Sequence, residues 1–385
     1  MIPYGRHNID KIDVNAVVEV LQGDWLTCGP VVEKFEDKLK QVVSAQHAIA
    51  CSNGTTALHL AMLALDIKAG DAVLVPAITF LASANSARYV GADVVFVDID
   101  SATGLMTSDT LEQAISANKH RNLRAVVNVH LAGQCENLQE IYNVAKKNGL
   151  LIIEDAAHAI GTVYIDSDGV KYPIGSNAFA DVTTFSFHPV KTIAMGEGGA
   201  ITTNNPEIAK KLKLFRSHGM IRNSTDWQGS EVGPWYYEMQ DLGYNYRVSD
   251  INCALALSQL EKLEDFKVKR AKICANYDNS FVTSEVTPIR KLRYSDTAWH
   301  LYVVLIDYVK SGKTRAQMMD NLKHEGVGTQ VHYIPLYKQP YYQKLYGKIS
   351  LPGCEDYYSK CLSLPLYVGL SENLQDKVIE SFKRC

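Results

Sequence analysis

Lys191 is the residue of this chain whose surroundings most clearly predict covalent chemistry. It closes the segment SFHPVK (residues 186–191), and the glycine-rich run MGEGGA (residues 195–200) follows shortly after it. The residues around it are apolar, and lysines are rarely buried without a purpose. A lysine amine at the end of a strand can condense with an aldehyde. The Ser186 hydroxyl and the nearby glycines suit a bound phosphate, so we expect an aldehyde cofactor that carries a phosphate group.

Asp155 is the second position with a chemical signature. Together with Glu154 it ends the apolar run LII (residues 151–153), and His158 follows three residues later. A buried carboxylate is costly unless it has a cationic partner. A protonated pyridine nitrogen is such a partner, and holding that nitrogen protonated makes the ring an electron sink. With Lys191, this carboxylate predicts pyridoxal 5′-phosphate (PLP). The alternative is that Asp155 caps the next helix and Glu154 faces solvent.

Two further segments fit a flat, phosphorylated ligand. The segment CSNGTTA (residues 51–57) joins an apolar run to a helical pattern, and the N–H groups at a helix start can bind an anion. An ordinary N-cap of Ser or Thr would have the same composition. Phe80 follows another apolar run and could stack on the cofactor ring, although a lone phenylalanine there is more often part of the core.

The elements that must position these residues are predicted by short apolar runs alternating with helical patterns. Such alternation indicates an α/β fold with a mostly parallel sheet covered by helices on both faces. Ligands of such sheets lie beyond the carboxyl ends of the strands, where the residues above are found. The seven predicted strands are AIACS, DAVLVPA, DVVFVDI, LRAVVNVHLAG, LLIIEDA, DVTTFSFH and GAITT, and the clearest helices are TALHLAMLALD and LQEIYNVAKKNG.

The C-terminal third has a different pattern. A long periodic stretch from Ser249 to Val282 predicts one connecting helix. The run WHLYVVLID, a helix around residues 317–324 and the run VGTQVHYIP follow it and indicate a smaller α+β domain. We therefore expect a large cofactor-binding domain over residues 1–248 and a small domain over residues 249–385.

Composition excludes several classes of protein. The 385 residues carry a net charge of -3 without a basic stripe, so we expect no nucleic acid partner. No apolar run approaches the roughly 20 residues of a membrane span, and the N-terminus lacks the pattern of a signal peptide, so we expect a cytoplasmic protein. Eight scattered cysteines include no Cys-x-x-Cys pair, which predicts neither a metal site nor disulfides. Neither a Gly-x-Gly-x-x-Gly run after the first strand nor a P-loop is present.

Taken in order, the motifs resemble the sugar aminotransferases of the DegT/DnrJ/EryC1/StrS family over nearly the whole chain. They are NGTTALHLA, PAITFLASAN, IIEDAAHAIG, FSFHPVKTIAMGEGGAITT, LFRSHGM, GYNYRVSDINCALALSQL and VHYIPLYKQPYY. The resemblance implies the aspartate-aminotransferase type of fold (PLP fold type I), with a seven-stranded sheet in the large domain. Within the family, FSFHPVK, LFRSHGM and QVHYIPLYKQPYY look most like the enzymes of pseudaminic acid biosynthesis.

The resemblance also implies residue roles. Lys191 would bind the cofactor covalently, Asp155 would pair with its pyridine nitrogen, and His158 would lie near its 3-hydroxyl. The remaining cofactor contacts would come from Gly54, Thr55, Thr56, Phe80, Ser186 and, in a homodimer with shared active sites, Asn245 of the neighbouring subunit. Substrate contacts would come from Tyr4, Asp24, Trp25, Leu26, Thr27, Gln330, Val331, His332 and Tyr333. Trp25 could instead be core packing and residues 331–333 an ordinary strand. For the donor's carboxylate the sequence offers only Arg247 and Arg216 as candidates.

The predicted activity is PLP-dependent amino transfer from L-glutamate to a nucleotide-linked 4-keto-6-deoxy sugar. The acceptor implied by the resemblance is UDP-2-acetamido-2,6-dideoxy-β-L-arabino-hex-4-ulose. The alternatives are an aminotransferase for another 4-keto or 3-keto sugar, a PLP-dependent sugar dehydratase, and a PLP-binding protein without catalysis. Relatives that dehydrate keto sugars carry histidine at the position of Lys191, which disfavours the dehydratase.

Overall fold

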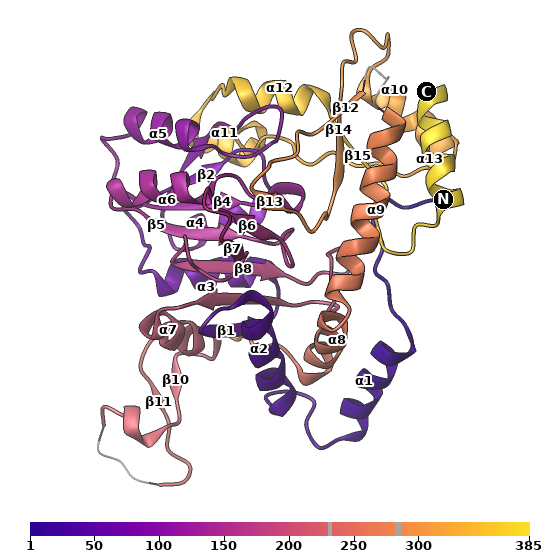
Figure 1. Ribbon diagram of the computed structural model, residues 1–385. Coiled ribbons are helices and arrows are strands. Elements are labelled where there is room, and N and C mark those ends of the chain that lie inside the picture. The colour runs from indigo at the N-terminus through magenta and orange to yellow at the C-terminus, as the bar shows by residue number, and fades with distance from the viewer. Residues whose placement is uncertain (230–232, 282–285) are drawn as a thin grey trace.

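The centre of the molecule is a seven-stranded, mostly parallel sheet, as the sequence predicts (Figure 1). The computed structural model describes residues 1–229, 233–281 and 286–385. The strand order is β1-β9-β8-β5-β4-β2-β3, and β9 alone in this sheet runs antiparallel to its neighbours. The strands are β1 (His47–Cys51), β2 (Ala72–Pro76), β3 (Asp93–Val97), β4 (Leu123–Val129), β5 (Leu151–Asp155), β8 (Val182–Ser186) and β9 (Gly199–Thr203). Consecutive residues of most of these strands are buried, because both faces of the sheet are covered.

Helices connect these strands and pack on them. α3 contacts β8 and β9, α4 contacts β2 and β3, and α6 contacts β5. α6 is strongly amphipathic, with Leu138, Ile141 and Ala145 buried at helical spacing. The helices of this part are α1 (Lys11–Gln22), α2 (Pro30–Val43), α3 (Gly54–Ala64), α4 (Leu81–Tyr89), α5 (Ser108–Ala117), α6 (Leu138–Lys147) and α7 (Pro206–Arg216).

The C-terminal part contains a second, antiparallel sheet of the order β12-β14-β15. Its strands are β12 (Val286–Pro288), β14 (Tyr302–Ile306) and β15 (Cys361–Leu364). The helices are α8 (Asp250–Leu260), α9 (Leu263–Phe281), α10 (Arg315–His324), α11 (Pro340–Tyr346), α12 (Pro352–Lys360) and α13 (Glu372–Arg384). A third small sheet joins β6 (Val163–Ile165) and β7 (Lys171–Pro173) to β13 (Ser295–Asp296).

The single connecting helix expected from Ser249 to Val282 is wrong in one respect, because the structure has two helices there. α8 ends at Leu260, α9 begins at Leu263, and Val282 lies outside the described residues. Lys262 at the break forms ion pairs with Asp10 (2.6 Å) and Asp13 (2.8 Å) at the start of α1. No glycine or proline marks this position, so the break depends on tertiary contacts that a periodic pattern does not contain.

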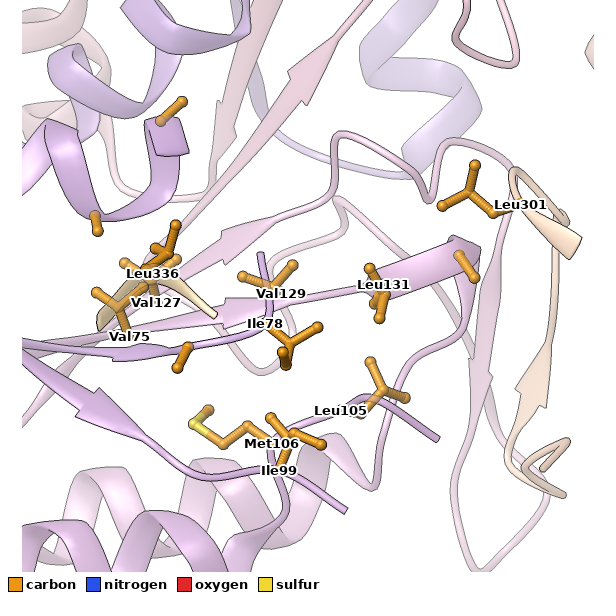
Figure 2. Packing of buried hydrophobic residues seen from close by; sticks show 14 of the residues in the cluster. Val75, Ile78, Ile99, Leu105, Met106, Val127, Val129, Leu131, Leu301 and Leu336 are labelled. Atoms are coloured by element: carbon orange, nitrogen blue, oxygen red, sulfur yellow. The ribbon is translucent and has the colours of Figure 1, made fainter. Parts of the chain in front are cut away.

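One hydrophobic core extends from the large sheet into the C-terminal part. Figure 2 shows Val75 of β2 and Val127 of β4 close to Leu336, and Leu131 on the side toward Leu301. All of these side chains belong to one buried cluster. The division at residue 248 stays a prediction, and the two parts share apolar contacts across it.

The chain ends and one hairpin complete the architecture. Both termini lie beside the small sheet (Figure 1), where Ile2 forms a parallel bridge with Val327. β10 (Met220–Ile221) and β11 (Glu238–Met239) form a hairpin that projects away from the body. Across the described ranges, no helix combines the length and apolarity that a membrane crossing requires. The cytoplasmic location stays a prediction. All eight cysteines are free, and six of them are buried.

Candidate active site

A cavity of about 930 Å³ opens at the carboxyl ends of the central strands. Lys191, Asp155 and Ser186 line it from the sheet, and His332 and Tyr333 line it from the C-terminal part. Most of the predicted site residues therefore face a common space. Those that line it are Tyr4, Gly54, Thr55, Thr56, Phe80, Asp155, His158, Ser186, Lys191, Gln330, Val331, His332 and Tyr333.

Lys191 lies in the loop between β8 and β9. Its backbone N–H donates to the carbonyl of His188 (2.8 Å), which fixes the turn that presents the side chain to the cavity. Burial lowers the pKa of Lys191 to about 8, and the negative charge of Asp155 partly opposes this shift. The amine is therefore far more often neutral near pH 7 than a solvent-exposed lysine, which is what nucleophilic attack and proton transfer require.

Asp155 ends β5 with its carboxylate buried. Its Oδ2 accepts a hydrogen bond from Ser83 Oγ (2.6 Å), and its Oδ1 accepts one from the backbone N–H of Ala157 (3.2 Å). Among the residues that the structure describes, no cationic side chain forms an ion pair with it. Glu154 does not face solvent, because it is only 3% exposed and accepts a hydrogen bond from Thr183 Oγ1 (2.8 Å).

The start of α3 lies against the end of β8. Asn53 caps the helix, with its side chain accepting from the Thr56 N–H (2.9 Å), so this segment does carry an N-cap, but the capping residue is an asparagine and not a Ser or Thr. The first N–H groups of a helix, here those of Gly54 and Thr55, have no intrahelical acceptor and are available to an anion. A Cβ on Gly54 would lie 2.7 Å from Cβ of Ser186, so only glycine allows this close approach.

Histidine and tyrosine side chains form another part of the cavity lining. Tyr333 Oη lies 3.3 Å from His158 Nε2, and the rings of His158 and His300 are 4.4 Å apart. Burial holds the pKa of His158 well below its usual value, and the positive charges of Lys191 and His332 add to this effect. His158 is therefore a neutral group that can donate or accept a hydrogen bond, and its buried Nδ1 has no hydrogen-bond partner within the described part of the chain.

Phe80 is 56% exposed, so it is not a core residue. Its ring lies 6.2 Å from that of Tyr333, at the same cavity. An open aromatic face beside the cavity suits stacking on a flat ring.

These groups fit PLP. A lysine with a lowered pKa can bind its aldehyde, and a buried carboxylate without an ion pair can take its ring nitrogen. The open helix start with Ser186 can bind its phosphate, and His158 offers an unpartnered nitrogen. The fold and the site together define a PLP-dependent enzyme of the aminotransferase type.

Five predicted residues do not line this cavity. Asp24, Trp25, Leu26 and Thr27 connect α1 to α2 and are exposed. Trp25 is 59% exposed and so is not core packing. Asn245 is also exposed, in an antiparallel bridge with Ser217, and its contact with a second subunit stays a prediction.

Neither candidate for the donor's carboxylate lines the cavity. Arg216 instead donates to Glu36 Oε1 (2.7 Å) and to the carbonyl of Ala50 (2.9 Å), so its charge is already neutralised by a structural partner. Residues 331–333 do not form a strand among the described residues, and only Gln330 bridges to Ser363 of β15.

Sequence reasoning missed Thr79 and Ser83 beside Asp155, and His300 beside His158. Hydroxyls four residues apart across a helix start, as in TFLAS, are a signal that could have identified the first two. His300 had no such signal, because only the tertiary fold brings it to His158.

Comparisons with known proteins agree with this site. The DegT/DnrJ/EryC1/StrS aminotransferase family model matches residues 7–383, and the chain belongs to this family. It is 39% identical to the spore coat polysaccharide biosynthesis protein SpsC of Bacillus subtilis, over 99% of this chain and 96% of the relative. It is 38% identical to the UDP-4-amino-4,6-dideoxy-N-acetyl-beta-L-altrosamine transaminase of Campylobacter jejuni, over 98% of this chain and 94% of the relative.

A solved structure gives the same result. Helicobacter pylori PseC, an aminotransferase involved in the biosynthesis of pseudoaminic acid, superimposes with a TM-score of 0.89 at 30% identity, covering 100% of this chain and 98% of PseC. Another similar structure was solved in a PMP-form, the aminated form of PLP. The predicted family, fold and cofactor are therefore confirmed, and this chain is a PLP-dependent sugar aminotransferase.

Proposed function

We propose that this enzyme transfers the amino group of L-glutamate to UDP-2-acetamido-2,6-dideoxy-β-L-arabino-hex-4-ulose, in pseudaminic acid biosynthesis. The observation that carries the proposal is the cavity, which is lined both by Lys191 and Asp155 of the large sheet region and by Gln330, His332 and Tyr333 of the C-terminal part. Two similar proteins support the choice of sugar, namely the Campylobacter jejuni transaminase and PseC.

In this proposal the residues divide the chemistry among themselves. PLP, when bound, supplies an electron sink for the negative charge that develops on the reacting carbon. Lys191, as a neutral amine, takes the proton from the α-carbon of glutamate, and later returns a proton to C4 of the sugar. Asp155 keeps the ring nitrogen protonated. The start of α3 and the Ser186 hydroxyl hold the phosphate.

Polar side chains of the cavity lining would determine which sugar binds. Tyr4, Gln330, His332 and Tyr333 offer hydroxyl, amide and imidazole groups to its hydroxyl and acetamido substituents. Burial lowers the pKa of His332 to about 3, and the positive charge of Lys191 contributes a smaller part of this shift. His332 would therefore contact the sugar as a neutral group. Polar groups placed against the sugar discriminate between stereoisomers, because the wrong stereoisomer leaves some of these groups unpaired.

The same proposal includes a homodimer with shared active sites. Asn245 is exposed and directly precedes Tyr246, a residue of the cavity. The hairpin of β10 and β11 projects from the body (Figure 1), and Trp235 and Tyr237, just before β11, are exposed. A second copy of the chain would cover such exposed aromatic residues. Asn245 would then reach the phosphate site of the partner.

Sugar specificity is tested by turnover with a panel of acceptors. The purified enzyme with PLP and L-glutamate is given the UDP-linked L-arabino 4-keto sugar, a UDP-linked 4-keto stereoisomer, a 3-keto sugar and a dTDP-linked 4-keto sugar, and 2-oxoglutarate release is followed. We expect kcat/KM for the first acceptor to exceed the others by about tenfold or more. Preference for a 3-keto or dTDP-linked sugar would refute the acceptor assignment while leaving the aminotransferase activity intact.

A second acceptor has support from a specific similarity. SpsC, at 39% identity, is named for spore coat polysaccharide biosynthesis. We therefore keep another nucleotide-linked keto sugar as the alternative acceptor of this chain, and the same panel separates the two assignments.

A further inference from the structure

Two buried hydroxyl groups, from α4 and from the segment before it, form a series of hydrogen bonds that ends at Asp155. Thr79 Oγ1 lies 2.8 Å from Ser83 Oγ, and Ser83 Oγ lies 2.6 Å from Asp155 Oδ2. Ser83 is 0% exposed, Thr79 is 2% exposed and Asp155 is 6% exposed. These three groups are therefore largely buried. A hydrogen bond to a charged group is stronger in such a buried environment than in water.

The number of protons on each group shows which hydroxyl donates in each of these two hydrogen bonds. A carboxylate oxygen only accepts, so Ser83 must donate its single hydroxyl proton to Asp155. The hydroxyl of Thr79 must then donate to Ser83 Oγ, which has no proton left for it. Both hydroxyl dipoles therefore point toward the carboxylate and stabilise its charged form.

The backbone connects this series of hydrogen bonds to the residue expected to stack on the cofactor. Ser83 lies in the first turn of α4, and its N–H donates to the carbonyl of Phe80 (3.3 Å). The helix start that places Phe80 at the cavity thus also places the Ser83 hydroxyl on Asp155.

We propose that Ser83 is a positioning residue for the transamination, with Thr79 supporting it: its hydroxyl holds the Asp155 carboxylate in the orientation and charge state in which it pairs with the ring nitrogen of PLP. This inference rests on the proposed role of Asp155. Without the Ser83 hydroxyl, the proton between the ring nitrogen and the carboxylate shifts toward the carboxylate, because the charged carboxylate has lost a donor. The electron sink is then weakened in the chemical step while substrate contacts are untouched.

The test compares four variants of the holoenzyme. Ser83→Ala removes the donor, Ser83→Thr restores a hydroxyl, and Asp155→Asn removes the carboxylate. Ser86→Ala is the matched control, because Ser86 is an equally buried serine of α4 that donates to the carbonyl of Ser83 (3.0 Å) and not to Asp155. Each variant is loaded with PLP labelled with ¹⁵N in the ring, and the ¹⁵N chemical shift of the ring nitrogen is measured together with kcat and KM for glutamate.

For Ser83→Ala we expect the nitrogen signal to move toward the unprotonated position, and kcat to fall about ten- to a hundredfold with little change in KM. Ser83→Thr should recover most of both, and Ser86→Ala should leave both near those of the parent. An unchanged signal in Ser83→Ala, while Asp155→Asn shifts it, would overturn the role of Ser83 and leave that of Asp155 intact. An unchanged signal in Asp155→Asn would instead refute the proposed nitrogen partner. Equal losses in Ser83→Ala and Ser86→Ala would show a merely structural serine.

Discussion

At the scale of single residues, the acidity of Lys191 decides how the site reacts with an aldehyde. Because burial lowers the pKa of this amine to about 8, about 9% of it is neutral at pH 7, against about 0.03% for a pKa of 10.5. The neutral amine is the nucleophile, so cofactor attachment should speed up as the pH rises toward 8 and level off above it.

This first prediction is checked with cofactor-free protein. The rate of covalent PLP attachment, followed by absorbance from about pH 6 to about pH 11.5, should have its midpoint near pH 8. Free Nα-acetyl-lysine serves as the control and should respond near its ordinary pKa of about 10.4. A protein midpoint close to that of the free amine would show that Lys191 is not the attacking group or is not buried.

The second prediction separates binding from chemistry at Lys191. Lys191→Ala removes the proton-transferring amine but keeps Asp155 and the start of α3, so kcat should fall by about a thousandfold or more while non-covalent PLP binding persists. Turnover and equilibrium dialysis of PLP measure the two effects. Lys213→Ala, at an exposed lysine of α7, is the control. Near-parental turnover in Lys191→Ala would remove this lysine from the mechanism.

At the scale of elements, the contact between α3 and β8 would form the proposed phosphate site. The third prediction is that Gly54→Ala destabilises the protein by about 1–3 kcal/mol and weakens PLP binding, since its Cβ would lie 2.7 Å from Cβ of Ser186. Gly5→Ala is the control, because a Cβ there meets only Val190 Cβ, at 3.9 Å. Thermal unfolding with and without PLP measures both effects. A Gly54→Ala protein as stable and as well loaded as the control would show that this close approach is not needed.

The strands were predictable from the sequence because each is buried on both faces and so is a continuous apolar run. The seven predicted runs contain all seven strands of the large sheet, from β1 to β9, apart from single residues at their ends. β6, β7 and β13 were not predicted, because each has only two or three residues, and β13 pairs with β6 over a long separation in sequence. The break between α8 and α9 escaped prediction for a related reason, since its partners are in α1.

The residues of the site also fall into those that the sequence predicts and those that only the fold reveals. Lys191, Asp155, Ser186 and Gly54 were predictable because unusual residue types follow apolar strands at one edge of a parallel sheet. The groups that hold them in place were not. The spacing of Thr79 and Ser83 was a weak signal, but only the packing of α4 places Ser83 on Asp155. His300 had no signal in the sequence, and the C-terminal part brings it to His158.

At the scale of the whole molecule, the large sheet region and the C-terminal part both contribute residues to the cavity lining. Tyr4 lines the cavity from the N-terminus, and its carbonyl accepts from the N–H of Leu366 near the C-terminus (3.0 Å). Lys191 of the large sheet region and His332 of the C-terminal part line the same cavity, so both parts would contact the sugar. These two parts also share one hydrophobic core.

The fourth prediction concerns the shared dimer. Lys191→Ala and Asn245→Ala subunits, each inactive alone, should recover about a quarter of parental activity when unfolded together and refolded, since half of the dimers are hybrids with one intact site of two. Lys191→Ala mixed with Asp155→Asn is the control, because both changes lie on the same side of the shared site and no intact site can form. Light scattering gives the oligomeric state. A fully active monomer, or equal activity in both mixtures, would refute the shared site.

The most direct test of the account is the location of the cofactor in the parental enzyme. Borohydride reduction of the PLP-loaded protein fixes the cofactor on the amine that carries it, and peptide mass spectrometry then locates that amine. Attachment through Lys191 predicts one modified peptide, which contains this lysine, and no modification when L-glutamate is added in excess before the borohydride. A cofactor fixed on another lysine, or a label that glutamate does not remove, would contradict it.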